Sequence, residues 1–274
     1  MIDLVRIKSD LATLTSNYGD EAVQDFLKDS LSNSNYATSY FGGRAEEYKA
    51  AYSLLQHIPV EVKEPMDDKV LKEKVNNIKV GITNPFSIGS LKKNFPSIEL
   101  IKSVGDVMKY DLIVVPGGED VNPKYYGSPN RGSYFDNKRD EVEVPLVEAA
   151  LHSNRKLFGI CRGHQLINIL LGCNFVQDIM SEEFAPHPSY HDLEWTNVGS
   201  SSVLFRFFNN RSVVSMHHQG LSKVNNRKVY TACMYKGIVE GCEGNNIITT
   251  QFHPEFQEDN EAFFSYLKEW AFIE

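Results

Sequence analysis

From residue 78 onward, short runs of β-branched and aliphatic residues alternate with stretches in which apolar residues recur three and four positions apart. The strand-like runs are Ile78–Thr83, Asp111–Val115 and Arg155–Ile160, and a helical stretch covers Asp140–Leu151. This alternation predicts an α/β fold with a mostly parallel central sheet flanked by helices. Ligand sites in such sheets lie at the carboxyl ends of the strands, so the residues that follow each run are the first candidates for chemistry.

The first 76 residues have a different pattern. They are polar, and their apolar residues, such as Val23, Phe26 and Leu27, stand at helical spacing. We therefore expect a mainly helical extension over residues 1–76 and a catalytic domain over residues 77–274. Whether the extension covers a site, docks a partner or completes the core is open at this point.

Composition narrows the class of protein. The 274 residues are 42% hydrophobic, which is enough for a substantial core, and 36 acidic against 28 basic residues give a net charge of −8. Without a dense basic run, direct binding of nucleic acid is disfavoured. Neither a signal-like N-terminus nor a stretch of about 18 apolar residues is present, so we expect a cytoplasmic protein without a membrane partner.

One cysteine stands at a turn suited to a nucleophile. Cys161 joins an apolar strand to an apolar-faced helix within the pattern Gly159-Ile160-Cys161-Arg162-Gly163. Glycines at these spacings allow the strained turn of a nucleophile elbow. The start of the following helix lowers a thiol pKa and offers a free backbone N–H. The alternative is a buried structural cysteine, which is how we interpret Cys173, Cys233 and Cys242.

A base and a group to orient it follow the last β-branched run. Ile247–Phe252 leads directly into His253-Pro254-Glu255. Proline stiffens this link, so the side chains of His253 and Glu255 can point the same way from an extended segment. A thiol nucleophile needs such a base, and the base needs a partner to fix its tautomer. A surface histidine and glutamate in a loop is the alternative interpretation.

Three motifs in order resemble the class I glutamine amidotransferase superfamily, which has a flavodoxin-like fold. They are Pro116-Gly117-Gly118, Gly159-Ile160-Cys161-Arg162-Gly163-His164-Gln165 and Gln251-Phe252-His253-Pro254-Glu255. Finer features are similar to the γ-glutamyl-γ-aminobutyrate hydrolase branch, peptidase family C26. These features are the run from Pro116 to Gly127, the pattern Asp136-x-x-Arg139-Asp140-x-x-Glu143, Arg162, and Ser215-Met216-His217-His218-Gln219. The resemblance spans residues 78–272.

The resemblance implies a cysteine hydrolase without a cofactor. Cys161 would attack a γ-glutamyl carbonyl, His253 would shuttle the proton and Glu255 would hold His253. The backbone N–H groups of Gly118 and Arg162 would form the oxyanion hole. The family pattern also implies that four residues contact the substrate: Gln165, His217, His218 and Gln219.

Two further patterns have competing interpretations. His217-His218 and His187-x-x-x-His191 invite a metal site, but Pro188 argues against a regular helix that presents 187 and 191 together, so no metal is predicted. The set Arg139, Asp140 and Glu143 suits a salt-bridge cluster at a helix start at least as well as a substrate clamp.

Three functions therefore compete. The first is hydrolysis of a small γ-glutamyl amide, which Arg162 and the His217-His218-Gln219 run favour. The second is the glutaminase part of an amidotransferase that delivers ammonia to a separate synthetase partner, which the unusual N-terminal extension favours. The third is a non-catalytic binding module, which the complete triad argues against. The leaving group and the oligomeric state are not legible in the sequence.

Overall fold

The structure is a computed structural model that describes residues 67–180, 184, 187–196 and 202–273. Most of the predicted helical extension over residues 1–76 lies outside the described residues. Its last part is the helix α5 (Asp68–Asn76), which begins where the side chain of Asp67 accepts hydrogen bonds from two backbone N–H groups. Residues 66–274 form one compact unit, and α5 belongs to it.

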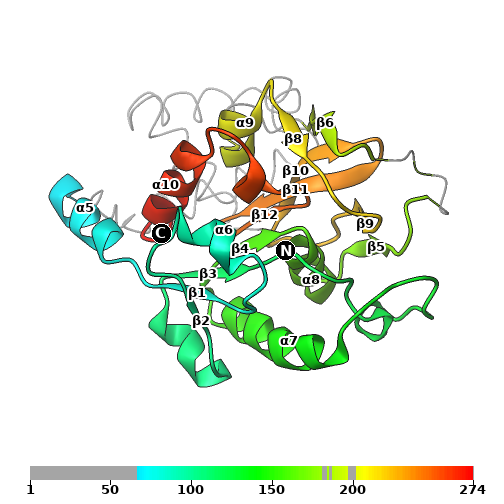
Figure 1. Ribbon diagram of the computed structural model, residues 1–274, viewed down its shortest axis with the longest axis horizontal. Helices are drawn as coiled ribbons and strands as arrows, with labels where there is room; N and C mark the ends of the chain where they lie inside the picture. The colour runs from blue at the N-terminus through cyan, green and yellow to red at the C-terminus, as the bar shows by residue number, and fades with distance from the viewer. Residues whose placement is uncertain (1–66, 181–183, 185–186, 197–201, 274) are drawn as a thin grey trace, which may run out of the picture. The chain divides into compact units, whose positions relative to one another are not determined.

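Five parallel strands form one half of the main sheet, as the alternating pattern predicts. In spatial order they are β2 (Glu99–Leu100), β1 (Val80–Ile82), β3 (Leu112–Val115), β4 (Lys156–Ile160) and β12 (Ile247–Thr250). Their neighbouring positions in the sheet are visible in Figure 1. Because β3, β4 and β12 are adjacent and parallel, their carboxyl ends meet at one edge of the sheet.

The other half of the sheet is antiparallel. It continues from β12 through β11 (Ile238–Gly244), β10 (Tyr230–Tyr235) and β7 (Glu194–Trp195), while β9 (Gly220–Lys223) pairs with β11 and β5 (Asn174–Val176) pairs with β9. A separate two-stranded sheet pairs β6 (Tyr190–Asp192) with β8 (Ser212–Val214). The sequence pattern predicts a mostly parallel sheet but does not resolve this half.

Helices cover both faces of the parallel strands (Figure 1). The helices α7 (Asn137–His152) and α8 (Arg162–Leu170) pack on one face, and α6 (Ile88–Lys92) and α10 (Glu261–Trp270) pack on the other. The helix α9 (Val203–Phe208) lies against β10 and β11 of the antiparallel half. Three short 3₁₀ helices cover Val104–Lys109, Pro123–Tyr126 and Pro254–Phe256. The described helices all fall short of the length and hydrophobicity that a bilayer-spanning helix requires.

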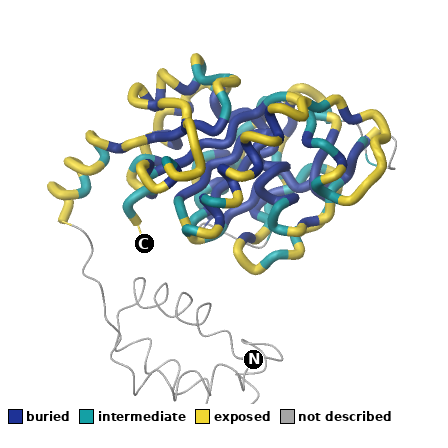
Figure 2. The backbone as a smooth tube through the Cα atoms, turned by 90° about the horizontal axis from the view of Figure 1, so that it is seen from below, coloured by how far each residue is buried: buried dark blue, intermediate teal, exposed yellow. Residues whose placement is uncertain are grey.

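Alternation along the strands builds two separate cores. In β3, Val114 faces the cluster that contains α10, whereas Ile113 and Val115 face the cluster that contains α7 and α8. Strands buried on both faces read as continuous apolar runs, which is why the sequence reveals them so clearly. Figure 2 shows the strands as a buried interior beneath helices whose outer surfaces are exposed.

Candidate active site

The three sequence motifs meet at the edge where β3, β4 and β12 end. Pro116-Gly117 follows β3, Cys161 follows β4, and His253 lies shortly after β12. The backbone N–H of Cys161 donates to the carbonyl of Thr250 over 2.7 Å, so the ladder between β4 and β12 continues into the turn. Segments that are more than 40 residues apart in sequence thereby supply one site, because the strands before them are neighbours in the sheet.

Cys161 occupies a strained turn between β4 and α8. Its backbone has φ 51° and ψ −106°, a conformation that costs a non-glycine residue about 1–3 kcal/mol. The flanking glycines are required by close packing. A Cβ atom on Gly163 would lie 1.9 Å from the carbonyl oxygen of Val115, and one on Gly159 would lie 2.9 Å from the backbone of Gly163. The turn therefore holds the thiol at the N-terminus of α8, as the G-x-C-x-G pattern predicts.

His253 and Glu255 form a buried pair. The Nδ1 atom of His253 lies 2.8 Å from Oε1 of Glu255, and the imidazole stacks on Phe256. Burial disfavours the imidazolium, but hydrogen bonds to Cys161 and Glu255 outweigh it and raise the pKa of His253 to about 10. At neutral pH the imidazole is therefore protonated, with its positive charge beside the sulfur of Cys161.

The turn after β3 packs against His253 and Cys161 through Gly117. A Cβ atom on Gly117 would lie 3.1 Å from Cε1 of His253 and 3.5 Å from Cβ of Cys161. The carbonyl of Gly117 accepts a hydrogen bond from Nη2 of Arg139 over 2.7 Å. Since a trans peptide directs its N–H opposite to its C=O, the N–H of Gly118 points away from Arg139. The assignment of this N–H, and of the Arg162 N–H, to an oxyanion hole stays a prediction.

The charged residues of α7 form the salt-bridge cluster rather than an open substrate clamp. The guanidinium of Arg139 pairs with Glu143 at 3.0 Å and with Glu119 at 2.8 Å. The guanidinium of Arg162, which is 1% exposed, pairs with Asp140 and Glu143. These contacts hold the start of α8, and therefore the turn at Cys161, against α7 and the Gly117 turn.

Gln165 and Gln219, which the resemblance assigns to substrate binding, bond to protein groups. The side-chain nitrogen of Gln165 donates to the backbone carbonyl of Gln219 and to the side-chain oxygen of Gln251, each over 3.1 Å. The amide of Gln219 donates to Ser133 and to the carbonyl of Gln177. Their direct contact with substrate stays a prediction.

His217 and His218 differ in exposure and in their hydrogen-bond partners. The side chain of His217 is buried, and its Nδ1 lies 2.8 Å from the carbonyl oxygen of Gln219. His218 is about half exposed and pairs with Asp120, whose hydrogen bond raises the pKa of His218 although burial opposes it. Between Cys161 and these histidines lies Met216, whose carbonyl oxygen is 3.8 Å from the sulfur of Cys161. His218 is thus the more accessible candidate for contact with a substrate.

Comparisons with known proteins identify the fold and the family. A solved structure of a protein described as a putative GMP synthase component from Thermoplasma acidophilum matches with a TM-score of 0.54 at 15% identity, over 71% of this chain and 94% of that one, which shows the fold. A putative glutamine amidotransferase-like protein, YvdE of Lactococcus lactis, is 32% identical over 163 residues, or 56% of this chain and 69% of the relative. The γ-glutamyl-γ-aminobutyrate hydrolase PuuD of Escherichia coli is 26% identical over 174 residues, or 56% of this chain and 67% of the relative.

The family model for peptidase C26 matches residues 66–255, a range that contains all three motifs. The chain belongs to the peptidase C26 family. Its fold is that of the class I glutamine amidotransferases, as the resemblance in the sequence predicts. The match also includes α5, which the sequence pattern groups with the extension.

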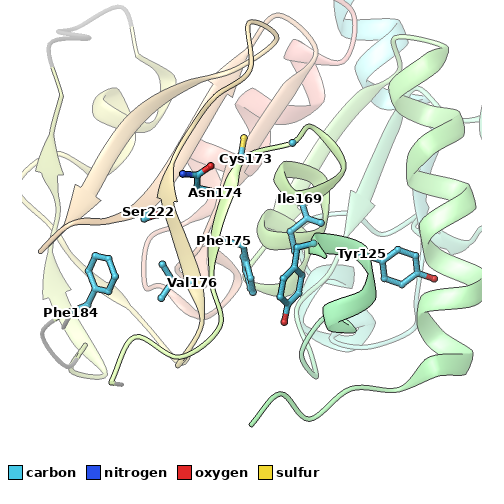
Figure 3. Close-up of a pocket in the computed structure, with 10 residues that line it drawn as sticks. Tyr125, Ile169, Cys173, Asn174, Phe175, Val176, Phe184 and Ser222 are labelled. Carbon is cyan, nitrogen blue, oxygen red and sulfur yellow. The ribbon is translucent and has the colours of Figure 1, made fainter. Parts of the chain in front are cut away.

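A cavity of about 540 Å³ is lined by residues other than Cys161, His253 and Glu255. Tyr125, Phe175 and Ile169 are among its lining side chains, as Figure 3 shows. Ile169 lies eight residues beyond Cys161 along α8, which at 1.5 Å per residue is a separation of roughly 12 Å. The three motifs that meet at the candidate active site contribute none of the residues that line this cavity, so it is separate from that site.

Sequence reasoning considered His187, His191 and His217 but missed the buried carboxylate that they face. Glu240, in β11, is fully buried and faces the imidazoles of His187, His191 and His217. The available signal was a glutamate inside the otherwise apolar run Ile238-Val239-Glu240, since a charged residue in a buried strand needs partners. As the sequence suggests, His187 and His191 do not share a helix. His191 lies in β6 and His187 precedes that strand.

Proposed function

We propose that this member of the peptidase C26 family hydrolyses a γ-glutamyl amide bond through a γ-glutamyl thioester on Cys161. The observation that carries the proposal is the meeting of Cys161, at a strained strand-to-helix turn, with the buried pair His253 and Glu255. The hydrolase name of one relative, PuuD, supports the choice of the γ-glutamyl group.

In the first half of the reaction, the sulfur of Cys161 attacks the carbonyl carbon of the γ-glutamyl amide. The negative charge that forms on the carbonyl oxygen would be stabilised by the N–H groups of Gly118 and Arg162, each worth about 2.7–4 kcal/mol. His253, which is protonated at neutral pH because of its raised pKa, gives its proton to the leaving amine as the C–N bond breaks. The products are a free amine and a thioester on Cys161.

In the second half, water attacks the thioester while His253 takes up its proton. The C–S bond breaks, glutamate leaves and the thiolate of Cys161 is restored beside a protonated His253. Glu255 holds the imidazole through Nδ1, which leaves Nε2 to exchange the proton. We place this reaction in the cytoplasm, a reducing compartment that suits the four unpaired cysteines.

The test is a panel of γ-glutamyl amines together with glutamine, assayed for glutamate and for the released amine or ammonia. The purified full chain should release an amine from at least one γ-glutamyl amine without a partner, and Cys161→Ala should abolish release. Cys233→Ala, which removes a buried thiol in β10, is the matched control and should retain activity. Unchanged turnover in Cys161→Ala would overturn the proposal.

A second candidate is the glutaminase part of an amidotransferase with a separate synthetase partner. The observation in its favour is that YvdE, a relative at 32% identity, is named as a putative glutamine amidotransferase-like protein. The same panel separates the two candidates. A glutaminase of this kind should be nearly idle on all γ-glutamyl amines and should release ammonia from glutamine only when its synthetase is added.

A further inference from the structure

We propose that His187, His217 and Glu240 bind a single Zn²⁺ ion in a buried site at the loop between β8 and β9, whose Met216 approaches Cys161. The three side chains come from different parts of the antiparallel half. Glu240 lies in β11, His187 precedes β6, and His217 lies in the loop between β8 and β9. Each side chain is at most 2% exposed.

The geometry of three atoms carries this inference. The Nδ1 atom of His187 lies 3.3 Å from Nε2 of His217 and 3.3 Å from Oε1 of Glu240, and the last two atoms are 3.4 Å apart. The three distances describe a nearly equilateral triangle. Zn²⁺ binds histidine nitrogen and carboxylate oxygen at about 2.0–2.2 Å in tetrahedral geometry, which separates neighbouring ligand atoms by about 3.3–3.5 Å. The triangle has the size of one face of that tetrahedron.

The hydrogen bond from Nδ1 of His217 also suits a metal ligand. A carbonyl oxygen can only accept a hydrogen bond, so the contact with the carbonyl of Gln219 at 2.8 Å assigns a proton to Nδ1 of His217. In the neutral ring, Nε2 then presents a lone pair toward His187 and Glu240. A backbone carbonyl that orients a histidine through its other nitrogen is the usual outer partner of a metal-binding histidine.

The carboxylate of Glu240 supplies the second, independent observation. The residue is 0% exposed, and neither of its oxygens accepts a hydrogen bond of good geometry from the described residues. The neighbouring imidazole nitrogens stand 3.3–3.6 Å away, which is longer than the 2.7–2.9 Å of a charge-assisted hydrogen bond. A proton shared between two of these ligand atoms would satisfy only that pair. A metal ion bound to Nδ1 of His187, Nε2 of His217 and Oε1 of Glu240 would satisfy all three.

The surroundings can complete the ligand shell. The Nε2 atom of His191 lies 3.6 Å from the second oxygen of Glu240, and its ring stacks on Tyr235. His191 can therefore orient the carboxylate or move in as the fourth ligand. The bound ion would tie the loop that contains Met216 and His217 to β11, and the carbonyl of Met216 is the group that approaches Cys161.

The test measures metal binding without substrate, so its outcome does not depend on the proposed function. The chain carries Cys161→Ala to remove the thiol of the candidate active site as a competing ligand, and it is stripped with a chelator before titration with Zn²⁺ against a coloured competitor. We expect one Zn²⁺ per chain. Co²⁺ should bind with the same stoichiometry and give the intense visible absorption of a tetrahedral site.

Three further variants assign the site. Glu240→Gln and His187→Ala should each weaken Zn²⁺ binding by about 100-fold or more, since changes to outer partners alone cost about 10–100-fold. His218→Ala is the matched control for metal binding, because it removes the neighbouring imidazole outside the triangle. Far-ultraviolet circular dichroism verifies the fold of each variant, and His187→Ala, which alters a loop, remains informative if Glu240→Gln unfolds.

Two results would overturn the inference. The first is a Zn²⁺ stoichiometry near zero in the stripped chain that carries Cys161→Ala. The second is an unchanged affinity in a folded His187→Ala or Glu240→Gln variant. Zero stoichiometry would mean that a proton on one imidazole, and not a metal ion, balances the charge of Glu240. Unchanged affinity in a variant would mean that the ion binds elsewhere.

Discussion

The two halves of the main sheet neutralise their buried carboxylates by different means. In the parallel half, Asp140 and Glu143 face the guanidinium groups of Arg139 and Arg162, so each negative charge has a permanent positive partner. In the antiparallel half, Glu240 faces imidazoles, whose charge depends on a proton or a metal ion. The first arrangement relies on guanidinium groups as counter-ions, whereas the second relies on a bound proton or a bound metal ion.

A further carboxylate, Glu243, shows that burial alone does not demand a cation. Glu243, also in β11, accepts hydrogen bonds from Ser202, from Tyr230 and from the backbone N–H groups at the start of α9. Neutral donors at a helix N-terminus are sufficient for a buried anion. Both residues lie in β11, but only Glu243 accepts hydrogen bonds on both of its carboxylate oxygens. The missing donors at Glu240 are therefore a property of its site and not of burial.

The largest expected effect is on turnover, in the parallel half. Glu255→Gln leaves His253 without its charged partner and should lower kcat by about 10⁴-fold, as in other triads that lose the orienting carboxylate. Glu243→Gln alters a buried carboxylate in the antiparallel half and should leave kcat close to that of the wild type. Steady-state kinetics of the two variants compare the halves directly, and equal losses would contradict the assignment of the triad.

The next effect is on stability. Arg162→Met keeps the backbone N–H but leaves Asp140 without its cationic partner and Glu143 with Arg139 alone, so the free energy of unfolding should fall by about 3 kcal/mol. Tyr230→Phe removes one of several neutral donors from Glu243 and should cost about 1.5 kcal/mol. Urea unfolding measures both. If Arg162→Met cost no more than Tyr230→Phe, the arginines would not be the main partners of the α7 carboxylates.

A smaller effect concerns the fit around the triad. Gly117→Ala would place a methyl group 3.1 Å from Cε1 of His253, and we expect kcat to fall by about 10²-fold through misplacement of the imidazole. Gly89→Ala, in α6, adds a methyl group with no atom within 4 Å and should change neither kcat nor the melting temperature. Full activity in Gly117→Ala would show that the turn after β3 does not confine His253.

The smallest effect is a shift in pH dependence. The pKa of His253 is about 10, above its ordinary value near 6.5, so its contribution to stability is complete below about pH 6.5 and is lost as pH rises through about 10. The same loss of the proton should lower kcat/KM above about pH 10. Because Glu255 is one cause of the raised pKa, the descending limb of Glu255→Gln should lie at lower pH. Glu243→Gln should leave the descending limb at the pH of the wild type. If the wild type, Glu255→Gln and Glu243→Gln all shared one descending limb, Glu255 would not be a cause of the raised pKa of His253.

The difference between the halves also explains what the sequence could predict. Cys161 and His253 follow apolar strands of a parallel sheet, so the strand pattern and the local motifs locate them without a structure. The triangle around Glu240 unites residues from β11, from the segment before β6 and from a loop. No periodic pattern relates these positions, because antiparallel pairings across long connections depend on register and packing. The ion pairs of Arg162 were likewise out of reach, since they depend on how α7 packs against α8.

The most direct test of the central claim is the covalent intermediate itself. The full chain is mixed with a γ-glutamyl amine that it turns over, quenched in acid and examined by intact-protein and peptide mass spectrometry. The account predicts one added γ-glutamyl group per chain, carried on the peptide that contains Cys161 and absent from Cys161→Ala. An active enzyme that carries the γ-glutamyl group on another residue, and keeps it in Cys161→Ala, would contradict the account.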